Sequence, residues 1–227
     1  PSAEPQADSF AGIAREQVQP RAWHVDSDWS VLESVRGSAV NLTCWQRRLP
    51  SEVESVLEQW ACQRPEAMER VVAARSFDLS PMLTGLPEPT RSWVLGDMAL
   101  LLSHFAAIAE ATHFRLSFGV VRSAQCPKFH VDHNRLRLIT TYSGPGTEWV
   151  PNEAVRRECM DQREDWPSNA NELIVPNAAA VQRTQAGDVL LMKGSRGNGT
   201  LGAVHRSPSS AGRFGRVVLV ASTVADS

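Results

Sequence analysis

The segment that most constrains the fold is residues 126–150, which reads CPKFHVDHNRLRLITTYSGPGTEWV. From Arg135 to Tyr142 it alternates arginine and leucine and then gathers β-branched residues, a pattern typical of a β-strand. The Gly-Pro-Gly triplet at 144–146 predicts a turn that ends this strand. His130 and Asp132 lie just before it, and side chains two positions apart on extended backbone point to the same face. The sequence therefore predicts an imidazole and a carboxylate side by side, placed to bind a metal ion.

A third candidate ligand, His205, lies well downstream, shortly before the β-rich residues 216–221. Two neutral imidazoles and one carboxylate on one face of an octahedron leave three positions open, which is the ligand set of non-haem iron(II) oxygenases. These ligands also favour Fe²⁺ or Mn²⁺ over metals that thiolates select. The alternative is that His130 and Asp132 form a hydrogen-bonded pair and that His205 is a core histidine. Because the three residues occur in this order and in strand context, we favour the metal site.

Four features in this order resemble the iron(II)/2-oxoglutarate-dependent dioxygenases. They are the His130-X-Asp132 pair, the segment GDVLLM at 187–192, His205, and Arg216 at the head of an apolar strand. That family has a double-stranded β-helix core, also called a jelly-roll or cupin-like fold, and the resemblance covers residues 114–223. The amino-acid sequence of the central segment also resembles that of an uncharacterised family of bacterial proteins.

The resemblance implies that His130, Asp132 and His205 bind Fe(II), with 2-oxoglutarate as cosubstrate and O₂ as oxidant. It implies an enzyme that hydroxylates a small molecule or a peptide. Two alternatives stay open. One is a cupin-like metalloprotein that does not use 2-oxoglutarate and acts as another oxygenase, an isomerase or a hydrolase. The other is a non-catalytic metal-binding module.

Arg216 is implied to anchor the distal carboxylate of 2-oxoglutarate, because a guanidinium matches a carboxylate through two hydrogen bonds and stays charged when buried. Arg213 competes for this role. In many family members a hydroxyl residue two positions later assists the arginine, but here that position is Val218. Tyr142 or Thr140 could supply the missing hydroxyl, although a packed strand aromatic is the ordinary interpretation of Tyr142.

Four further residues are candidates for contacts at the site. Arg137 could bind an acidic group of the substrate or cosubstrate, or lie solvated on its strand. Glu148 and Trp149 follow the turn and would lie at the mouth of a barrel; the alternatives are turn-end polarity and a capping aromatic ring. Cys126 lies four residues before His130 and could approach the metal, or serve as a small buried apolar residue.

The first half of the chain predicts helices that support a sheet. Ser51 and Glu54 fit a capping box at the start of a helix over 52–63, and Pro65 is expected to begin a second helix. The longest apolar stripe lies at 91–111 and predicts a helix that packs against the sheet.

We therefore expect an α+β protein with a loose N-terminal arm at 1–20 and a single domain over 21–227. Within that domain, 21–112 is expected to be mainly helical and to buttress the double-stranded β-helix, or jelly roll, of 113–227.

Two segments of the expected jelly roll carry further predictions. Residues 181–192 are expected to form a hairpin with its turn at 185–188. The polar segment 149–173 is expected to be a long loop, which is either a lid over the metal or a surface insertion.

Composition limits the classes of partner. A formal charge of −2 over 227 residues gives no reason to expect nucleic acid or a membrane surface. Four cysteines without a CxxC pair predict reduced thiols and hence a cytoplasmic protein. Polar residues interrupt the apolar run at 98–102, which predicts a core helix and not a membrane span. The sequence makes no prediction of oligomeric state.

Overall fold

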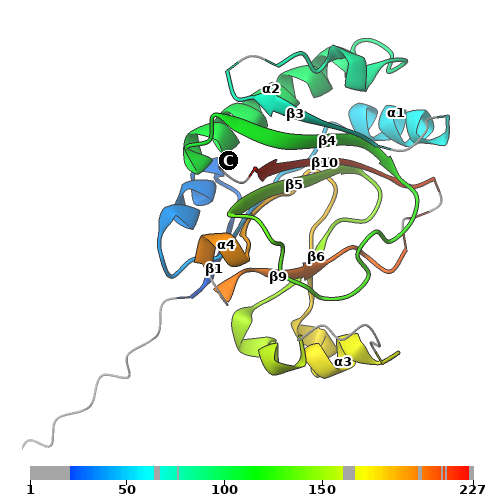
Figure 1. Ribbon diagram of the computed structural model, residues 1–227. Helices are drawn as coiled ribbons and strands as arrows, with labels where there is room; N and C mark the ends of the chain where they lie inside the picture. Colours follow the sequence, from blue (N-terminus) through cyan, green and yellow to red (C-terminus); the bar gives the residue numbers. More distant parts are fainter. Residues whose placement is uncertain are drawn as a thin grey trace, which may run out of the picture.

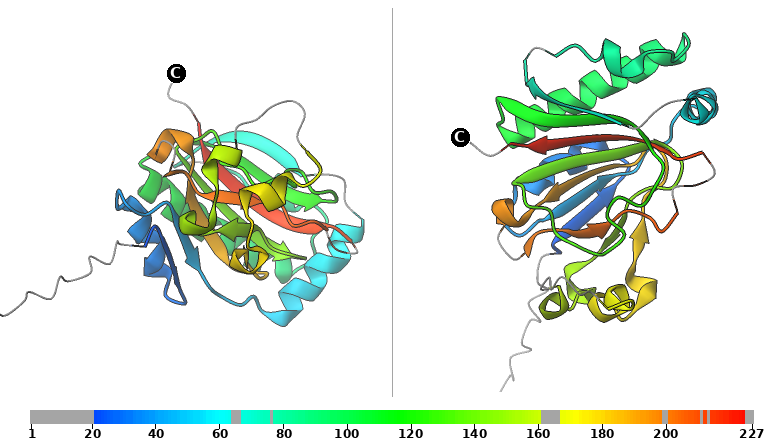
Figure 2. Two further views of the ribbon diagram at one scale, coloured as in Figure 1. Left: turned by 90° about the horizontal axis from the view of Figure 1, so that it is seen from below. Right: turned by 45° about the vertical axis from the view of Figure 1, so that its right-hand side comes forward.

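The computed structural model describes residues 21–63, 67–75, 77–160, 167–198, 201–210, 212 and 214–224. Two β-sheets lie between helices, with α1 and α2 on one side and α3 on the other (Figure 1). Two further views, one from below and one turned by 45°, show the same arrangement (Figure 2). The chain is thus a mixed α+β protein, as the sequence predicts, and it is built around one large sheet.

The larger sheet has seven strands, and all neighbouring pairs are antiparallel except β1 and β2, which run parallel. In spatial order its strands are β1 (Trp23–Asp26), β2 (Leu42–Trp45), β8 (Val189–Lys193), β5 (Leu136–Ser143), β10 (Arg216–Thr223), β4 (His113–Val121) and β3 (Met68–Ala73). The smaller, antiparallel sheet has the order β7 (Gln182–Arg183), β6 (Glu148–Val150) and β9 (Val204–Arg206).

Side-chain alternation divides the larger sheet into two faces. On β5, Leu136, Leu138 and Tyr142 point into the main hydrophobic core beneath the helices. Arg137 and Ile139 point to the other face and line a hollow. Because strand side chains alternate, one short strand contributes both to the core and to a polar interior between the sheets.

The two predicted long helices are present and pack on the larger sheet. They are α1 (Ser51–Cys62) and α2 (Thr90–Ala109). Short helical segments complete the fold: η1 (Trp29–Arg36), η2 (Ser80–Leu83), η3 (Asn152–Ala154), η4 (Arg157–Cys159), α3 (Ala170–Ile174), η5 (Ala178–Ala180) and α4 (Ser195–Asn198).

The packing of α2 explains its apolar sequence. It is the one helix among the described residues that is long and apolar enough to cross a membrane. Its residues Val94, Met98, Leu101 and Phe105 are fully buried in the main core, so α2 has the environment predicted for a core helix. At the start of α1, the predicted capping box is not formed, because Pro50 is the N-cap residue and no side chain caps the helix.

Two expectations about secondary structure were wrong. The helix expected from Pro65 onward is instead β3, an edge strand paired with β4. The hairpin expected at 181–192 does not form, because β7 belongs to the smaller sheet and β8 to the larger one. The segment 21–112, expected to be mainly helical, holds η1, α1, η2 and α2, and it also supplies three strands to the larger sheet. The predicted arm at 1–20 lies outside the described residues.

Candidate metal centre

Backbone pairing brings two of the predicted ligands together. His205 is the middle residue of β9, and His130 pairs with it through an isolated antiparallel bridge. The two residues exchange backbone hydrogen bonds of 3.0 Å in both directions. Directly opposed residues of an antiparallel pair project to the same side. The two imidazole rings accordingly lie 4.5 Å apart between centroids.

Asp132 completes the cluster from the loop between this bridge and β5, and not from a regular strand as predicted. Its Oδ2 lies 3.4 Å from Nε2 of His205, and its Oδ1 lies 3.7 Å from Nε2 of His130. The candidate ligand atoms of the three residues all lie within 4.8 Å of one another. The structure thus brings together the three residues that the sequence predicts as metal ligands.

Backbone carbonyls fix the orientation of both imidazoles. Nδ1 of His130 lies 2.8 Å from the carbonyl oxygen of Lys128, and Nδ1 of His205 lies 3.2 Å from that of Ala203. A carbonyl can only accept a hydrogen bond, so each Nδ1 carries the proton and donates it. Each Nε2 is thereby left to face Asp132. Metal-binding histidines typically use one ring nitrogen this way while the other binds the ion.

Burial and charge set the protonation of the site. Burial lowers the pKa of His205 to about 4, so its imidazole is neutral near pH 7. Burial acts to raise the pKa of Asp132, but the hydrogen bond from His130 and the charges of His205 and Arg137 outweigh it and lower the pKa to about 2. At His130, hydrogen bonds to Asp132 and to the Lys128 carbonyl outweigh burial and raise the pKa. Near neutral pH the site therefore holds a carboxylate and at least one imidazole with a free lone pair.

One oxygen of the carboxylate has no partner. Oδ2 of Asp132 is buried and has no hydrogen-bond partner among the described residues, whereas buried carboxylates are normally paired or hydrogen-bonded. It faces the unprotonated Nε2 of His205, so two lone pairs point at each other across 3.4 Å. A divalent cation between these atoms would bind both, and nitrogen and oxygen donors of this kind suit Fe²⁺ or Mn²⁺. The residues therefore fit the metal that the resemblance implies.

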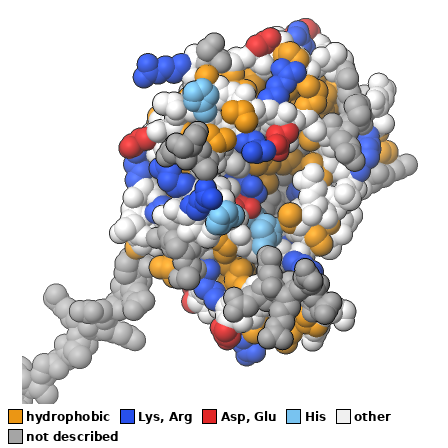
Figure 3. All heavy atoms as spheres, in the orientation of Figure 1, with side chains coloured by type: hydrophobic (Ala, Val, Ile, Leu, Met, Phe, Trp, Pro, Cys, Tyr) orange, Lys and Arg blue, Asp and Glu red, His pale blue; other side chains and the backbone are white. Residues whose placement is uncertain are grey.

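Arg216 lies in the same hollow as the two histidines. The hollow has a volume of about 80 Å³ and is lined by residues of both sheets. Arg216 is 3% exposed, and burial lowers its pKa. Among the described residues, its guanidinium donates to the carbonyl oxygen of Pro145 at 3.4 Å and forms no ion pair. Lys, Arg and His side chains gather on this side of the molecule (Figure 3). A buried cation without an acidic partner is suited to bind an anionic ligand.

The two proposed hydroxyl partners of Arg216 are not in the hollow. Tyr142 is fully buried on the helix side of β5, and its hydroxyl donates to Oδ2 of Asp97 at 2.7 Å. Thr140 lies on the same face of β5, two residues from Tyr142, and is also buried. Both therefore point away from Arg216, because the face they share is the one that packs under the helices. Arg213, the competing arginine, lies outside the described residues.

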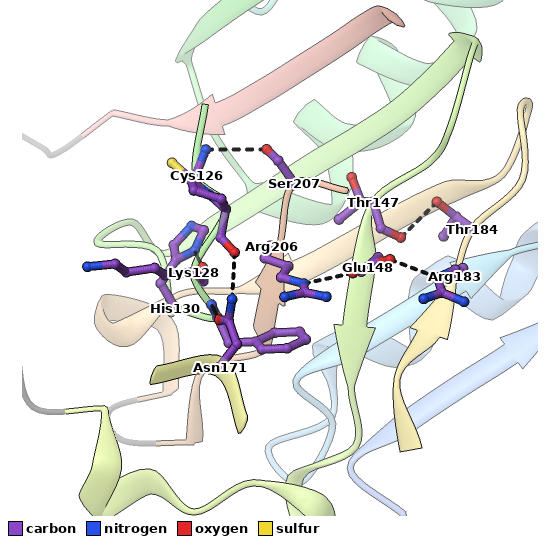
Figure 4. Close-up of polar contacts among 12 residues, drawn as sticks. Cys126, Lys128, His130, Thr147, Glu148, Asn171, Arg183, Thr184, Arg206 and Ser207 are labelled. Atoms are coloured by element: carbon purple, nitrogen blue, oxygen red, sulfur yellow. Dashed lines mark hydrogen bonds and ion pairs between the residues drawn. The ribbon is translucent and has the colours of Figure 1, made fainter. Parts of the chain in front are cut away.

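Glu148 and Trp149 do not line the hollow either. Glu148 is buried on β6, and its carboxylate accepts hydrogen bonds of 2.7 Å from both Arg183 and Arg206 (Figure 4). Burial acts to raise the pKa of Glu148, but these two arginines outweigh it and lower the pKa. Trp149 packs in a second apolar cluster, where its ring centroid lies 5.4 Å from that of Trp23. Structural contacts account for both residues.

Arg137 and Cys126 do line the hollow. Arg137 contacts the candidate metal site directly, because its Nη1 lies 2.7 Å from Oδ1 of Asp132. Cys126 is exposed, and partial burial of its thiol raises its pKa. The backbone N–H of Cys126 donates to the Ser207 hydroxyl at 3.4 Å (Figure 4).

Sequence reasoning missed the supports of the site. The side chain of Asn171 accepts a hydrogen bond from the Phe129 N–H at 2.9 Å and donates to the Pro127 carbonyl at 3.0 Å, which holds the segment that leads into His130 (Figure 4). Thr147 lines the hollow together with Arg216. An isolated asparagine or threonine in a polar stretch gave no signal of either role.

The segment predicted as a lid or an insertion packs behind the site. Val150 joins Phe129 and Val204 in a third apolar cluster, and Val155 and Met160 pack against it. Through Asn171, this segment also holds the chain just before His130. The described part of 149–173 therefore supports the histidines from outside the smaller sheet, whereas residues 161–166 lie outside the described residues.

Comparison with solved structures finds distant similarity to oxygenases. A putative oxygenase from Shewanella oneidensis is 10% identical with a TM-score of 0.44, covering 90% of this chain and 89% of its own. A prolyl-4-hydroxylase from Pseudomonas putida is 9% identical with a TM-score of 0.42, covering 87% and 93%. A full-length Neurospora crassa protein in complex with alpha-KG is 10% identical with a TM-score of 0.37, covering 86% and 76%. Similarity at this level identifies neither a substrate nor a reaction.

Comparison of the sequence itself gives a clearer result. No curated protein matches it. The model of one family matches residues 26–221, a span that includes His130, Asp132, His205 and Arg216. The resemblance of the central segment to an uncharacterised family is thereby confirmed. The chain belongs to the family described as "Protein of unknown function (DUF1826)".

Proposed function

We propose that this protein is a non-haem iron(II) and 2-oxoglutarate-dependent oxygenase that hydroxylates a small molecule or a peptide. One observation carries the proposal: Oδ2 of Asp132 is buried without a hydrogen-bond partner among the described residues and faces the free Nε2 of His205 at 3.4 Å. A hydrogen-bonded structural cluster would place a donor at that oxygen. A metal ion bound through this oxygen requires that no hydrogen-bond donor occupy it.

The strand order supports a double-stranded β-helix core in residues 113–227. In chain order, β4 and β5 lie in the larger sheet with the His130 bridge between them, and β6 and β7 lie in the smaller sheet. The chain then alternates, with β8 in the larger sheet, β9 in the smaller and β10 in the larger. Such crossing between two antiparallel sheets is how a jelly roll is wound. In this arrangement β8, β5, β10 and β4 form the centre of the larger sheet, and β1, β2 and β3 extend its two edges.

His130, Asp132 and His205 would hold the iron, and their set of two imidazoles and one carboxylate leaves three positions for other ligands. Iron bound there, with 2-oxoglutarate and O₂, supplies the oxidising power that converts a C–H bond into C–OH while 2-oxoglutarate becomes succinate and CO₂. The protein's own contribution is to orient these ligands and to exclude water. The apolar side chains of Ile139 and Val218 on the walls of the hollow serve the second purpose.

Arg216 would bind the distal carboxylate of 2-oxoglutarate. Its burial and its lack of an ion-pair partner among the described residues support this role, because an unpaired buried guanidinium gains most from a carboxylate ligand. Thr147 lines the same hollow and could supply the hydroxyl that Val218 lacks.

A second candidate function is a metal-dependent enzyme of the same fold that does not use 2-oxoglutarate. It is favoured by Val218 at the position where family members carry a hydroxyl, and by the placement of Thr140 and Tyr142 on the other face of β5. Replacing Arg216 would then leave turnover intact.

An anaerobic titration tests the proposal. Fe²⁺ and 2-oxoglutarate added to the wild-type protein should give a weak visible charge-transfer band. The band should vanish in His205→Ala and weaken in Arg216→Met. The matched control is Arg183→Met, which removes an arginine whose side chain is 69% exposed and which does not line the hollow. An iron-loaded wild type without the band would rule out 2-oxoglutarate chelation. A band unchanged in Arg216→Met would rule out the anchor.

The remaining parts of the proposal concern context. We infer a cytoplasmic protein that acts on a small molecule or peptide and does not bind nucleic acid or membranes, because the net charge is close to zero. Succinate formation during incubation with a panel of metabolites and peptides would identify the substrate class.

A further inference from the structure

Arg137 is held at two points beside the candidate metal site. It lies on β5 opposite Ser222 of β10 in the strand register. Its Nε donates to the Ser222 hydroxyl at 3.0 Å, and its Nη1 lies 2.7 Å from Oδ1 of Asp132. Two neighbouring strands thus fix the guanidinium, and the guanidinium in turn fixes one oxygen of the carboxylate.

This contact makes the two oxygens of Asp132 unequal. Oδ1 is engaged by Arg137, whereas Oδ2 is buried and bare and faces His205. A carboxylate free of such a contact can bind a metal through one oxygen or through both. Two-oxygen binding would use one more coordination position.

The number of open positions matters for the proposed chemistry, on which this inference rests. Two imidazoles and one oxygen of the carboxylate leave three positions, enough for a chelating cosubstrate and O₂. If the carboxylate bound through both oxygens, the cosubstrate would fill the remaining two, and none would be left for O₂.

We propose that Arg137 is a positioning residue that, by holding Oδ1, restricts Asp132 to coordination through Oδ2 and so keeps the third coordination position open. A positive side chain beside a divalent metal site is electrostatically unfavourable, since Arg137 and the metal ion would repel each other. That Arg137 lies there nevertheless supports a positioning role. A side chain that were only solvated would have no reason to point inward, yet that of Arg137 is only 29% exposed and lines the hollow.

Counting the waters on a bound metal ion tests the proposal without 2-oxoglutarate and without turnover. Mn²⁺ is the probe, because it takes octahedral sites of nitrogen and oxygen donors, and pulsed EPR in D₂O counts its bound waters. Wild-type protein should show three waters. Arg137→Met should show two, because the released Oδ1 joins the metal. Arg137→Lys should restore three, since an ammonium group can still donate to Oδ1.

Arg115→Met is the control for loss of an arginine, because Arg115 of β4 forms an exposed ion pair with Glu69 of β3 and does not line the hollow. It should keep three waters. Three waters in Arg137→Met, or two in the wild type, would overturn the role of Arg137 while leaving the metal site in place. No Mn²⁺ binding by the wild type would overturn the proposed function as well. Thermal melting of each metal-free variant confirms that the comparison is between folded proteins.

Discussion

Replacing Asp132 by asparagine should abolish metal binding and yet leave the stability of the metal-free protein nearly unchanged. Asparagine keeps the shape of the side chain, and its carbonyl oxygen can take the position of Oδ1, which lies 2.7 Å from Nη1 of Arg137. Its NH₂ group then takes the position of Oδ2, 3.4 Å from the lone pair of His205 Nε2. The change therefore places a donor where the wild type has a bare acceptor.

Three contributions decide the size of the effect. Removing a buried acceptor without a partner relieves about 1–3 kcal/mol, and the new N–H···N hydrogen bond contributes about 0.5–1.5 kcal/mol. Against these stands the loss of the interactions with Arg137 and the two histidines that lower the pKa of Asp132 to about 2, which are worth about 2 kcal/mol. The free energy of unfolding should therefore change by no more than about 2 kcal/mol. For a chain of this length, Tm should shift by only a few degrees, at roughly 2–4 °C for each kcal/mol.

Asp97→Asn is the matched control. Asp97 is a largely buried carboxylate whose two oxygens are both satisfied, by the guanidinium of Arg47 and by the hydroxyl of Tyr142. Breaking that network should cost about 3–5 kcal/mol. Urea unfolding in the presence of a chelator measures both variants, and isothermal titration with Mn²⁺ measures metal binding. If Asp132→Asn loses about 3 kcal/mol or more in chelator, as Asp97→Asn should, then Asp132 is a structural residue and the metal site is refuted.

Three further predictions follow from the same geometry. Because the pKa of His130 is raised, protons should compete with the metal below that pKa, and Mn²⁺ affinity should fall about tenfold per pH unit on acidification. His205, with a pKa of about 4, should bind a proton in place of the metal only in strong acid. An affinity that does not change between about pH 5.5 and 8 would contradict this. Gly194→Ala should weaken Mn²⁺ binding at least tenfold, because the added Cβ would lie 2.3–2.7 Å from three oxygen atoms of the loop that follows His130. The control is Gly96→Ala, whose added Cβ would have no atom within 4 Å; it should stabilise α2 by up to about 1 kcal/mol and leave Mn²⁺ binding unchanged. Arg216→Met should raise Tm in the absence of ligand, because it removes a buried cation without an ion-pair partner among the described residues. The variant should also lose the Tm increase that 2-oxoglutarate gives the wild type. A lower Tm than the wild type in the absence of ligand would show that Arg216 is a structural residue.

The sequence was sufficient to select three residues that the fold brings together, but not to predict the geometry that joins them. Order and strand context identified His130, Asp132 and His205, whereas the reason given, a shared face on one regular strand, was only partly right. The backbone bridge between His130 and His205 aligns the imidazoles, and Asp132 reaches them from a loop. Pairing between positions so distant in sequence depends on the whole fold, and no local pattern reports it.

The alternation of side chains along β5 is enough to separate Tyr142 from Arg137. Tyr142 is five residues from Arg137 on β5, so the two side chains must lie on opposite faces of a regular strand. Parity alone therefore excluded a hydroxyl from Tyr142 beside the metal site, and the structure places it under the helices instead. The support from Ser222 had no such signal, because it depends on the register between β5 and β10.

The wrong helix at β3 has a different cause. Met68, Val71 and Val72 recur at helical spacing, and an edge strand with little burial on either face shows no period of two to oppose that pattern. Met68 and Val71 are in fact among the most exposed large apolar side chains described. Tertiary pairing with β4, and not local preference, determines this segment.

The first hundred residues hold no candidate ligand, yet the site depends on them. Strands from 113–223 form the centre of the larger sheet, and β2 and β3 cover edges that would otherwise present unpaired backbone groups. Helices α1 and α2 cover the apolar face that β4, β5 and β10 share. Arg137 and Arg216 lie on the opposite face of those same central strands. Because one side of each strand can be held in register only while the other side is packed, the N-terminal helices and edge strands set the positions of the groups that we propose to bind the metal and the anion.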